Sequence, residues 1–320
     1  MRWSLEEAYQ TWGVTTARAA GQRLEIGEFR PMTPVTLAWR DEQTRHLVCT
    51  GYIEQIRASV SKDSRAIELQ GRSRSVLLRR SSRYTQRQLT HITLQDLAVM
   101  LASETGLDII CDVPEDLPLE GQPQIGVSGL DLLRGALEHT LYIAVPMADG
   151  RLYIGQPPIH RGEAIRIGEG GSGVISAEYA GSVADRYTSY TYMGQRGAAT
   201  SQVIIEDRDW TDLDIPLIAV ADKSPQGHED LRGRALREAR VTAAKGVSIT
   251  LEMPRWIDVK RKTVWTPGTW HHVTWPELGV DADLILQSVE LRADVDRVGA
   301  TLTLVPTLLY YPDKGQWLWR

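Results

Sequence analysis

The stretch LVCTGYIEQIRASVSKDSRAIELQGRSRSVLLRRS, residues 47–81, predicts two strands joined by a short turn. Within the first strand, the apolar residues Val48, Tyr52 and Ile56 recur at an even spacing. Successive side chains of a strand point to opposite faces, so this spacing places the three residues on one face. The polar run at 61–64 has the composition of a turn.

The second strand of this stretch shows a clearer alternation. Ile67 and Leu69 alternate with polar residues, as is typical of a half-buried strand. The residues Gly71, Arg72 and Ser73 end this strand, and the apolar run that follows from residue 75 predicts a new element.

Length and composition place the chain among ordinary globular proteins. Its 320 residues are enough for two or three domains, and 42% are hydrophobic and 24% charged. The net charge is −5 and the pI is about 5.9, so a dominant basic surface for nucleic acid is not expected.

The two cysteines predict free thiols. Cys49 and Cys111 lie far apart in the sequence and in apolar, strand-like surroundings, which favours buried thiols over a disulfide or a metal pair. A reducing cytoplasm agrees with this. The first ten residues carry no apolar run typical of a signal peptide, and no window approaches the roughly 18 apolar residues of a membrane helix.

The first 46 residues predict short strands. Residues 24–26 and 35–39 read as strands, and turns separate them from each other and from the stretch at 47–81. This spacing suggests a small antiparallel barrel. The first strand is expected to be missing, or replaced by a helix at 5–10.

From about residue 87 the pattern changes to helices. Thr93 can cap a helix that begins at Leu94, with Asp96 reaching back to it, and Gly106 is suited to end it. Leu94, Leu97, Met100 and Leu101 give this helix an apolar face. A strand is predicted at 108–111.

A second helix and a hairpin complete this region. Ser128 caps the predicted helix, which turns Leu130, Leu133 and Leu137 inward. Strands at 141–145 and 151–154 flank Asp149-Gly150, a dipeptide that favours a tight turn. Residues 87–165 therefore predict a small α+β domain.

The last part of the chain predicts strands around one long helix. A flexible junction at 165–173 precedes strands at 174–179 and 187–194 and a polar loop at 197–202. The helix extends from about residue 226 to 245, and Gly246 ends it. Further strand-like segments lie at 247–253, 265–268, 272–275, 284–291 and 299–305.

Several short motifs occur in a fixed order along the chain. They are TGYIE at 50–54, GRS at 71–73, DGRLYI at 149–154, YMGQ at 192–195 and RALREAR at 234–240. In their order and spacing they resemble the baseplate hub proteins of Mu-like contractile phage tails. Those hubs are related to the hub proteins of T-even phages and to the spike-hub proteins of type VI secretion. The resemblance covers most of the chain, from Val48 to Leu309.

The resemblance implies a mostly β, α+β fold with two tube-type antiparallel β-barrel domains. The first would occupy residues 1–86 and the second residues 166–320, which include the long helix, with the α+β insert at 87–165 between them. It also implies that three chains close a ring of pseudo-sixfold symmetry, which joins the tail tube to the central spike and leaves a channel for DNA.

The implied partners are the components of a tail. They are two further copies of the chain, a tail spike protein, a tail tube or distal tube-adaptor protein, baseplate wedge proteins and a tape measure protein. DNA would pass through the lumen without specific binding. The expected location is the virion, in the tail baseplate, after assembly in the cytoplasm of the bacterial host.

Two glycine-containing patterns do not carry catalytic chemistry. The run at 168–173 lacks the Lys-Ser/Thr end of a phosphate loop and precedes a predicted strand, so it is interpreted as a linker. Ser128 and Ser172 do not fit a nucleophile elbow, because the following glycine comes one position too early.

Paired carboxylates occur at Asp207 and Asp209 and at Asp212 and Asp214. Such pairs can bind a cation or act as acid and base, but the central glycine and closing glutamate of a calcium loop are absent. A solvated acidic loop is favoured. A third alternative is a negative patch lining the channel, which would repel DNA phosphates.

Adjacent histidines and clustered arginines favour structural roles. His271 and His272 would point to opposite faces of a strand and so cannot chelate one ion together. The arginines of the long helix are interpreted as a solvated or interface row rather than as a nucleic-acid site; they are Arg232, Arg234, Arg237 and Arg240. Three more arginines are candidates for contacts with a neighbouring subunit; they are Arg72, Arg79 and Arg80.

No combination of nucleophile, base and oxyanion donor emerges, so the prediction is a structural protein with no catalytic residue, cofactor or metal. Two alternatives stay open. One is a tail-associated enzyme that degrades the cell wall, with Asp207 or Asp209 in its site, and the other is a β-rich module that binds a receptor or glycan.

Overall fold

The computed structural model describes most of the chain. The described residues are 1–5, 7–19, 29–40, 44–60, 64–80, 92–114, 126–137, 140, 142–157, 159–171, 173–184, 186–196, 199–206, 216–220, 228–294 and 297–311. The prediction of a strand at 24–26 lies outside them. Strands predominate over helices, which confirms the mostly β fold class.

The chain folds as two compact units, each of which combines segments distant in sequence. Unit 1 comprises Met1–Glu163, Met253–Thr269 and Gln287–Leu302. Unit 2 comprises Ala164–Glu252, Trp270–Leu286 and Thr303–Arg320. The division into domains at residues 86 and 165 stays a prediction.

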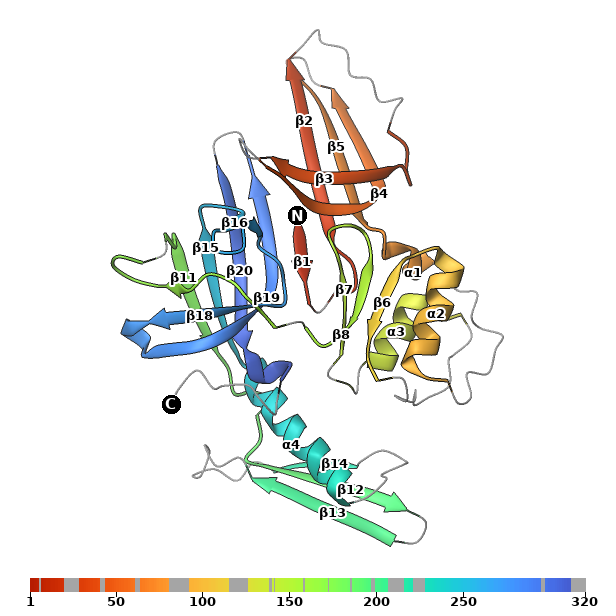
Figure 1. Ribbon diagram of the computed structural model, residues 1–320, viewed down its shortest axis with the longest axis vertical. Helices are drawn as coiled ribbons and strands as arrows, with labels where there is room; N and C mark the ends of the chain where they lie inside the picture. Colours follow the sequence, from red (N-terminus) through yellow and green to blue (C-terminus); the bar gives the residue numbers. More distant parts are fainter. Residues whose placement is uncertain are drawn as a thin grey trace. The chain divides into compact units, whose positions relative to one another are not determined.

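Unit 1 contains an antiparallel sheet built from the first third of the chain (Figure 1). Its strands are β1 (Arg2–Ser4), β2 (Thr11–Ala19), β3 (Pro34–Arg40), β4 (Arg45–Val60) and β5 (Ser64–Ser73), in the order β1-β2-β5-β4-β3. Strands β4 and β5 pair antiparallel, as the opening stretch predicts. The alternative of a helix at 5–10 is wrong, because the described residues there form no helix. The strand β2 was not predicted.

The sequence predicts that Val48, Tyr52 and Ile56 of β4 share one face, but they do not, although Val48 is buried. Cys49 and Ile53 are fully buried and form a core cluster with Trp12, and Ile56 packs against this cluster. The register between β4 and β5 shifts between Ile53 and Gln55. A bulge adds one residue to a strand and so reverses which positions face inward beyond it. For this reason Ile56 shares a face with Cys49 and Ile53, and not with Val48 and Tyr52.

Two glycines allow β4 and β5 to approach closely. A Cβ atom on Gly51 would collide with the backbone carbonyl of Arg72 on the facing strand. One on Gly71 would collide with the carbonyl oxygen of Tyr52 and with the ring of Trp12. These glycines belong to the TGYIE and GRS motifs, so the close packing of the two strands explains why each motif contains a glycine.

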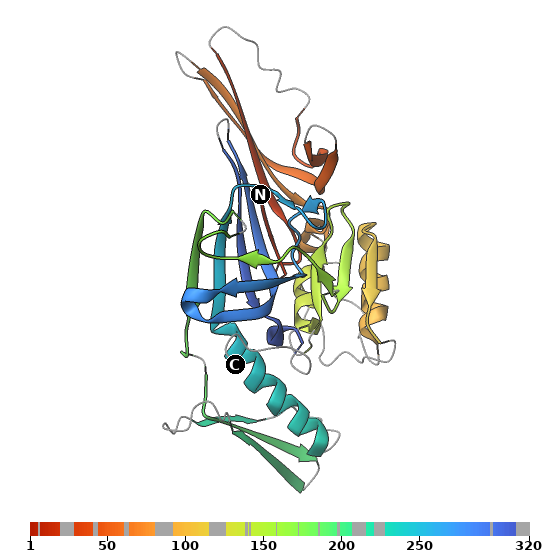
Figure 2. The same cartoon turned by 60° about the vertical axis from the view of Figure 1, so that its left-hand side comes forward.

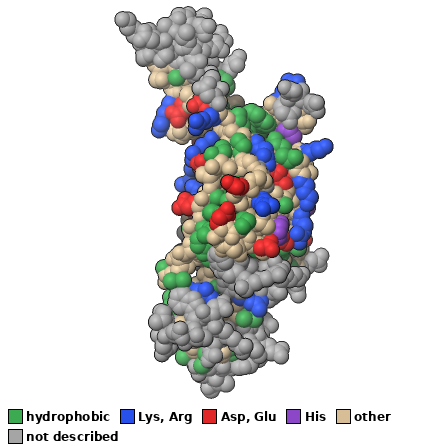
Figure 3. Space-filling model, turned by 90° about the vertical axis from the view of Figure 1, so that its left-hand side faces the viewer, with side chains coloured by type: hydrophobic (Ala, Val, Ile, Leu, Met, Phe, Trp, Pro, Cys, Tyr) green, Lys and Arg blue, Asp and Glu red, His purple; other side chains and the backbone are tan. Residues whose placement is uncertain are grey.

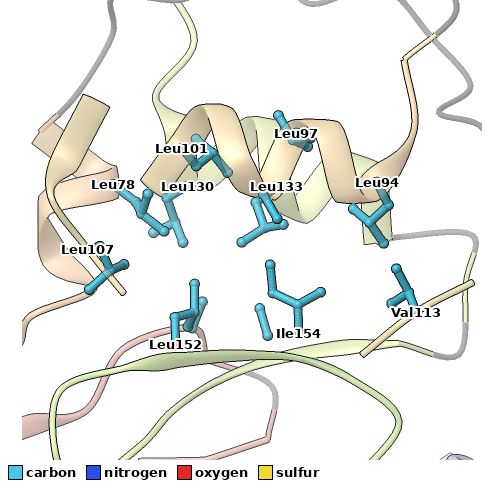
Figure 4. Packing of buried hydrophobic residues seen from close by; sticks show 13 residues of the cluster. Leu78, Leu94, Leu97, Leu101, Leu107, Val113, Leu130, Leu133, Leu152 and Ile154 are labelled. Atoms are coloured by element: carbon cyan, nitrogen blue, oxygen red, sulfur yellow. The ribbon is translucent and has the colours of Figure 1, made fainter. Parts of the chain in front are cut away.

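Unit 1 also contains the predicted helix and hairpin region. Helices α1 (Val76–Arg80), α2 (Leu94–Thr105) and α3 (Gly129–Leu137) accompany strands β6 (Ile109–Asp112), β7 (Ile143–Pro146) and β8 (Leu152–Gly155). The strand order is β6-β8-β7. Figure 4 shows the core between the helices and this sheet. Leucines from α2 and α3 face Leu152 and Ile154 of β8.

The ends of these elements lie where their local signals predict. Thr93 and Asp96 form a reciprocal capping box at the start of α2, and Gly106 follows the helix with a left-handed φ of 65°. Hydrogen bonds from the backbone and side chain of Thr93 lower the pKa of Asp96. The Ser128 hydroxyl accepts from the Asp131 amide, which caps α3.

The main sheet of unit 2 uses strands from the last part of the chain. Its order is β11 (Ser176–Gly181), β15 (Val247–Met253), β20 (Val298–Pro306) and β19 (Val280–Ala293), with β18 (Thr269–Trp275) also paired to β19. The later part of β19 and the first part of β20 belong to unit 1, where β19 pairs with β1, so that β1–β5 continue the same sheet. The strand β10 (Ile165–Arg166) pairs with β18 in parallel. The strand predicted at 265–268 is wrong, because these residues form a turn that includes Gly268 at φ 89°.

The large sheet that the described residues form is open. In unit 1 the order ends at β3, and in unit 2 it ends at β11. The two closed barrels that the resemblance implies are therefore not formed by these strands alone. A closed barrel would need a partner strand at each of these edges.

A second, smaller layer of unit 2 contains the long helix. Strands β12 (Ser189–Arg196), β13 (Ala199–Glu206) and β14 (Pro216–Val220) form a sheet in the order β13-β12-β14. Helix α4 (His228–Lys245) lies along this sheet and contacts β12 and β13 (Figures 1 and 2). The helix confirms the prediction at 226–245, whereas the polar loop predicted at 197–202 is wrong, because residues 199–202 belong to β13.

Candidate functional site

The acidic pairs of the sequence fall outside the part of the chain that the structure describes. These residues are Asp207, Asp209, Asp212 and Asp214, and Ser172 lies outside it as well. Among the described residues, no group of three or more His, Cys, Asp or Glu side chains is arranged to hold a metal ion. None of the described helices is both long and apolar enough to span a bilayer.

The glycine run at 168–173 connects two strands. It follows β10 and precedes β11, so a strand and not a helix comes after it, as expected. Gly168, Gly170 and Gly173 adopt positive φ angles, and the Gly171 amide donates to the Gly168 carbonyl. Ser128 serves as the cap of α3. Both patterns therefore have structural roles.

The adjacent histidines point to opposite faces of β18, as predicted. His271 is fully buried, and the neighbouring His272 is exposed. His272 lies between two carboxylates, with Nε2 3.0 Å from Asp281 Oδ1 and Nδ1 3.1 Å from Asp283 Oδ1. The ring nitrogens face different carboxylates, so this group links β18 to β19 and does not surround one ion.

Two of the three candidate interface arginines are held within the chain. The carboxylate of Glu54 accepts from Arg72 at 2.8 Å and from Arg80 at 3.2 Å. The guanidinium of Arg72 also lies 4.9 Å from the ring centre of Tyr9. This network ties β4 and β5 to α1. Arg79 is exposed at the end of α1.

The arginine row of α4 is described only in part. The side chains of Arg232, Arg234 and Arg237 lie outside the described set, and Arg240 is half-buried. Four alanines of the same helix are buried; they are Ala235, Ala239, Ala243 and Ala244.

Both cysteines are free thiols, as predicted. Cys49 is fully buried, and burial raises its pKa to about 12. Cys111 is half-buried, and burial followed by the charge of Asp112 raises its pKa as well. Neither thiol has the lowered pKa of a reactive cysteine.

A pair of buried carboxylates in unit 1 was not predicted. Glu163 is 9% exposed and Asp258 is 2% exposed. Glu163 pairs with Arg255 at 2.5 Å, and its backbone amide donates to Asp258 Oδ2 at 3.4 Å. Glu163 lies more than ninety positions from both partners, so no local sequence signal indicates this arrangement.

These two carboxylates hold the loop between β16 (Ile257–Asp258) and β17 (Thr263–Val264). The Val259 amide donates to Glu163 Oε2 at 2.8 Å. The amides of Lys260 and Arg261 donate to Asp258 Oδ1 at 3.0 and 3.1 Å. Three consecutive backbone donors of the loop are thus satisfied by side chains that are themselves buried.

Exposed sheet edges and apolar side chains form the remaining candidate surfaces. Strand β3 ends the order of the sheet in unit 1, and β11 ends it in unit 2. Near β11, Ile175 and Val183 are exposed. On the face shown in Figure 3, hydrophobic side chains intermix with charged side chains of both signs. Such a surface suits contacts between proteins better than it suits a nucleic acid.

Comparison with protein families and with curated proteins gives one informative relative. No family model matches the chain. The baseplate hub protein gp44 of Escherichia phage Mu is 23% identical over 239 residues, which are 69% of this chain. The match spans 62% of the relative's length, which is less than two thirds of it.

Solved structures of tail proteins share the fold over almost the whole chain. A 43 kDa tail protein of prophage MuSo2 from Shewanella oneidensis has a TM-score of 0.77 at 18% identity, covering 95% of this chain and 92% of that one. A tail protein from Neisseria meningitidis MC58 has a TM-score of 0.78 at 18% identity, covering 98% and 92%.

A type VI secretion component from E. coli is more distant. That protein, c3393, is described as structurally similar to the T4 tail proteins gp27 and gp5. It has a TM-score of 0.57 at 12% identity and covers 95% of this chain and 71% of its own. The resemblance to Mu-like baseplate hub proteins, first indicated by short motifs, is thus confirmed.

Proposed function

We propose that this chain is a structural hub of a contractile tail baseplate. The observation that carries the proposal is its similarity to the phage Mu hub protein, combined with a fold that Mu-like prophage tail proteins share over nearly its full length. In this role the chain works by shape and by its contacts, and it has no catalytic residue. Its location is the baseplate of a virion, after assembly in the cytoplasm of the host bacterium.

Three copies would close a ring of pseudo-sixfold symmetry. A ring needs a contact between two different surfaces of the same chain, so that each copy binds the next one. The open edges at β3 and β11 support this arrangement, because unpaired strand edges in a soluble protein are usually covered. In the ring, residues 1–86 and 166–320 would serve as the two tube-type modules, with the insert at 87–165 between them.

The ring would join the tail tube to the central spike. Its partners would be the spike protein, a tube or tube-adaptor protein, wedge proteins and a tape measure protein. DNA would cross the lumen without specific binding. The net charge of −5 supports this last point, because DNA adheres to basic surfaces.

The oligomeric state of the purified chain tests the proposal. Sedimentation velocity should give a species of three chains, each of 35.8 kDa, either alone or after addition of the cognate spike. Negative-stain images of that species should show a ring with a central hole. A chain that stays monomeric with and without the spike, or compact particles without a hole, would contradict the proposal.

The same preparation separates the two alternative functions. A tail-associated enzyme would release soluble products from cell walls, and the release would be lost in Asp207→Asn or Asp209→Asn. A glycan-binding module would retain a glycan on an array at micromolar protein concentrations. The hub proposal expects neither result.

A further inference from the structure

A basic loop in unit 1 lies between β16 and β17. It consists of Val259, Lys260, Arg261 and Lys262, and we refer to it as the basic loop. Val259 is 59% exposed, and both lysines are exposed. Within the described part of the chain, no carboxylate pairs with the ammonium groups of Lys260 and Lys262. Arg261 is half-buried, so the loop presents two exposed ammonium groups beside one apolar side chain.

The basic loop is held in one conformation. Its backbone amides donate to the buried carboxylates of Glu163 and Asp258, and Arg261 Nη1 donates to Thr269 Oγ1 at 2.6 Å. Lys262 has a φ of 53°, a left-handed conformation that is uncommon for a residue with a side chain. A loop fixed in this way loses little entropy when it binds a partner.

An acidic hairpin in unit 2 has the opposite charge. It comprises residues 277–283, between β18 and β19 and at the start of β19, and we refer to it as the acidic hairpin. Its exposed carboxylates are Glu277 and Asp281, and the side chain of Asp281 is 70% exposed. The side chain of Asp283 is only 15% exposed, and both aspartates contact the ring of His272. Leu278 is 39% exposed among them. No lysine or arginine occurs between residues 264 and 291.

We propose that the basic loop of one copy docks on the acidic hairpin of the next copy. This inference rests on the proposed ring and identifies one of its contacts. Each surface has two exposed charges of one sign and one exposed apolar side chain, so that the two surfaces complement each other. The two surfaces belong to different parts of the same chain, as a head-to-tail contact requires. Opposite charges would select the partner and fix the register of the contact.

A second copy is a better occupant than DNA. Phosphate binding does not use an apolar side chain, and Val259 lies exposed at the start of the loop. The chain as a whole is acidic, which opposes the approach of a polyanion. The acidic hairpin supplies the complementary surface on every copy at an equal concentration.

Charge reversal tests the docking. In Lys260→Glu/Lys262→Glu and in Glu277→Lys/Asp281→Lys, like charges would face each other, and we expect association to weaken about tenfold or more. The chain with all four substitutions restores opposite charges and should regain assembly. Sedimentation velocity over a dilution series measures each association, and thermal unfolding checks that each variant is folded.

Two controls accompany these variants. Lys245→Glu/Arg297→Glu makes the same change of net charge as the loop variant, at exposed positions outside both surfaces, and should assemble normally. The wild-type chain provides a test that needs no substitution. Raising the salt concentration from about 50 mM to about 500 mM should weaken its assembly, because salt screens exposed charges.

The outcomes separate this contact from the ring itself. A monomeric wild-type chain, with and without the spike, would overturn the proposed function and this contact together. A trimeric wild type whose charge-reversed variants assemble normally would overturn the contact alone. Failure of the fourfold variant to regain assembly would overturn the pairing. Loss of DNA binding in Lys260→Glu/Lys262→Glu, with normal assembly, would assign the basic loop to DNA instead.

Discussion

At the scale of single residues, glycine positions explain why the opening stretch has its sequence. Gly51 and Gly71 face backbone atoms across the β4–β5 pair at distances that leave no space for a Cβ atom. Gly51 is paired with Ser73, and Gly71 is paired with Ile53, on either side of the core residues of β4. A side chain at either position would force the strands apart.

Replacing Gly71 tests this explanation. Gly71→Ala should lower the free energy of unfolding by about 1–3 kcal/mol, the usual cost of adding a methyl group where no space exists. Gly13→Ala is the matched control, because Gly13 is exposed on β2 and a Cβ atom there meets only ordinary contacts. Urea unfolding of both variants gives the comparison. Equal stability of the two would contradict the explanation.

Residue-level chemistry could be predicted only where it is local. The opposite orientations of His271 and His272 follow from the period of a strand, and the free thiols follow from their apolar surroundings. The pairing of Glu163 with Arg255 and its contact with Asp258 could not be predicted, because only the tertiary fold brings these residues together.

At the scale of elements, the helices were the easiest to predict. Thr93, Asp96 and Gly106 are local signals of both ends of α2, and each has the role that its position indicates. The strands β2 and β13 were missed, because neither shows a regular alternation of apolar and polar residues. Strand β2 is held by pairing with the distant β5, whereas β13 forms a hairpin with β12. The prediction that Val48 and Ile56 of β4 share a face was wrong, because a bulge changes the alternation and leaves no sign in the sequence.

The leucine core of the insert gives a prediction for an element. Leu97 of α2 is fully buried between the helices and the sheet (Figure 4). Leu97→Ala should therefore lower the free energy of unfolding by about 2–5 kcal/mol. Val99→Ala, on the exposed side of the same helix, should change stability by less than about 0.5 kcal/mol. Hydrogen exchange of the α2 and α3 amides measures the local effect. A similar loss of protection in both variants would contradict this packing.

At the scale of the whole molecule, the mostly β class and the relationship to tail hubs could be predicted, whereas the closure of the sheets could not. Strand composition and the order of motifs can be read from the sequence of a single chain. The described strands have open edges at β3 and β11 and do not form two closed barrels. Whether an edge finds a partner depends on neighbouring copies, and a single sequence carries no direct signal of them.

The charge of the whole chain predicts its behaviour toward DNA. We expect no measurable affinity for a double-stranded DNA fragment at about 150 mM salt, with a Kd weaker than about 10⁻⁴ M. The reason is the net charge of −5, which makes the approach of phosphates unfavourable. Fluorescence anisotropy of a labelled duplex measures this affinity. Micromolar binding that persists at this salt concentration would contradict the expectation.

The burial of Cys49 has a practical consequence for mapping the assembly. Burial raises the pKa of the Cys49 thiol to about 12, so Cys49 carries little of the reactive thiolate at pH 8. A chain with Cys111→Ser should therefore form few cross-links through its remaining native cysteine. Cysteines introduced at Val259 and Leu278 would then form a covalent ladder of chains only if these two positions meet at the junction between neighbours.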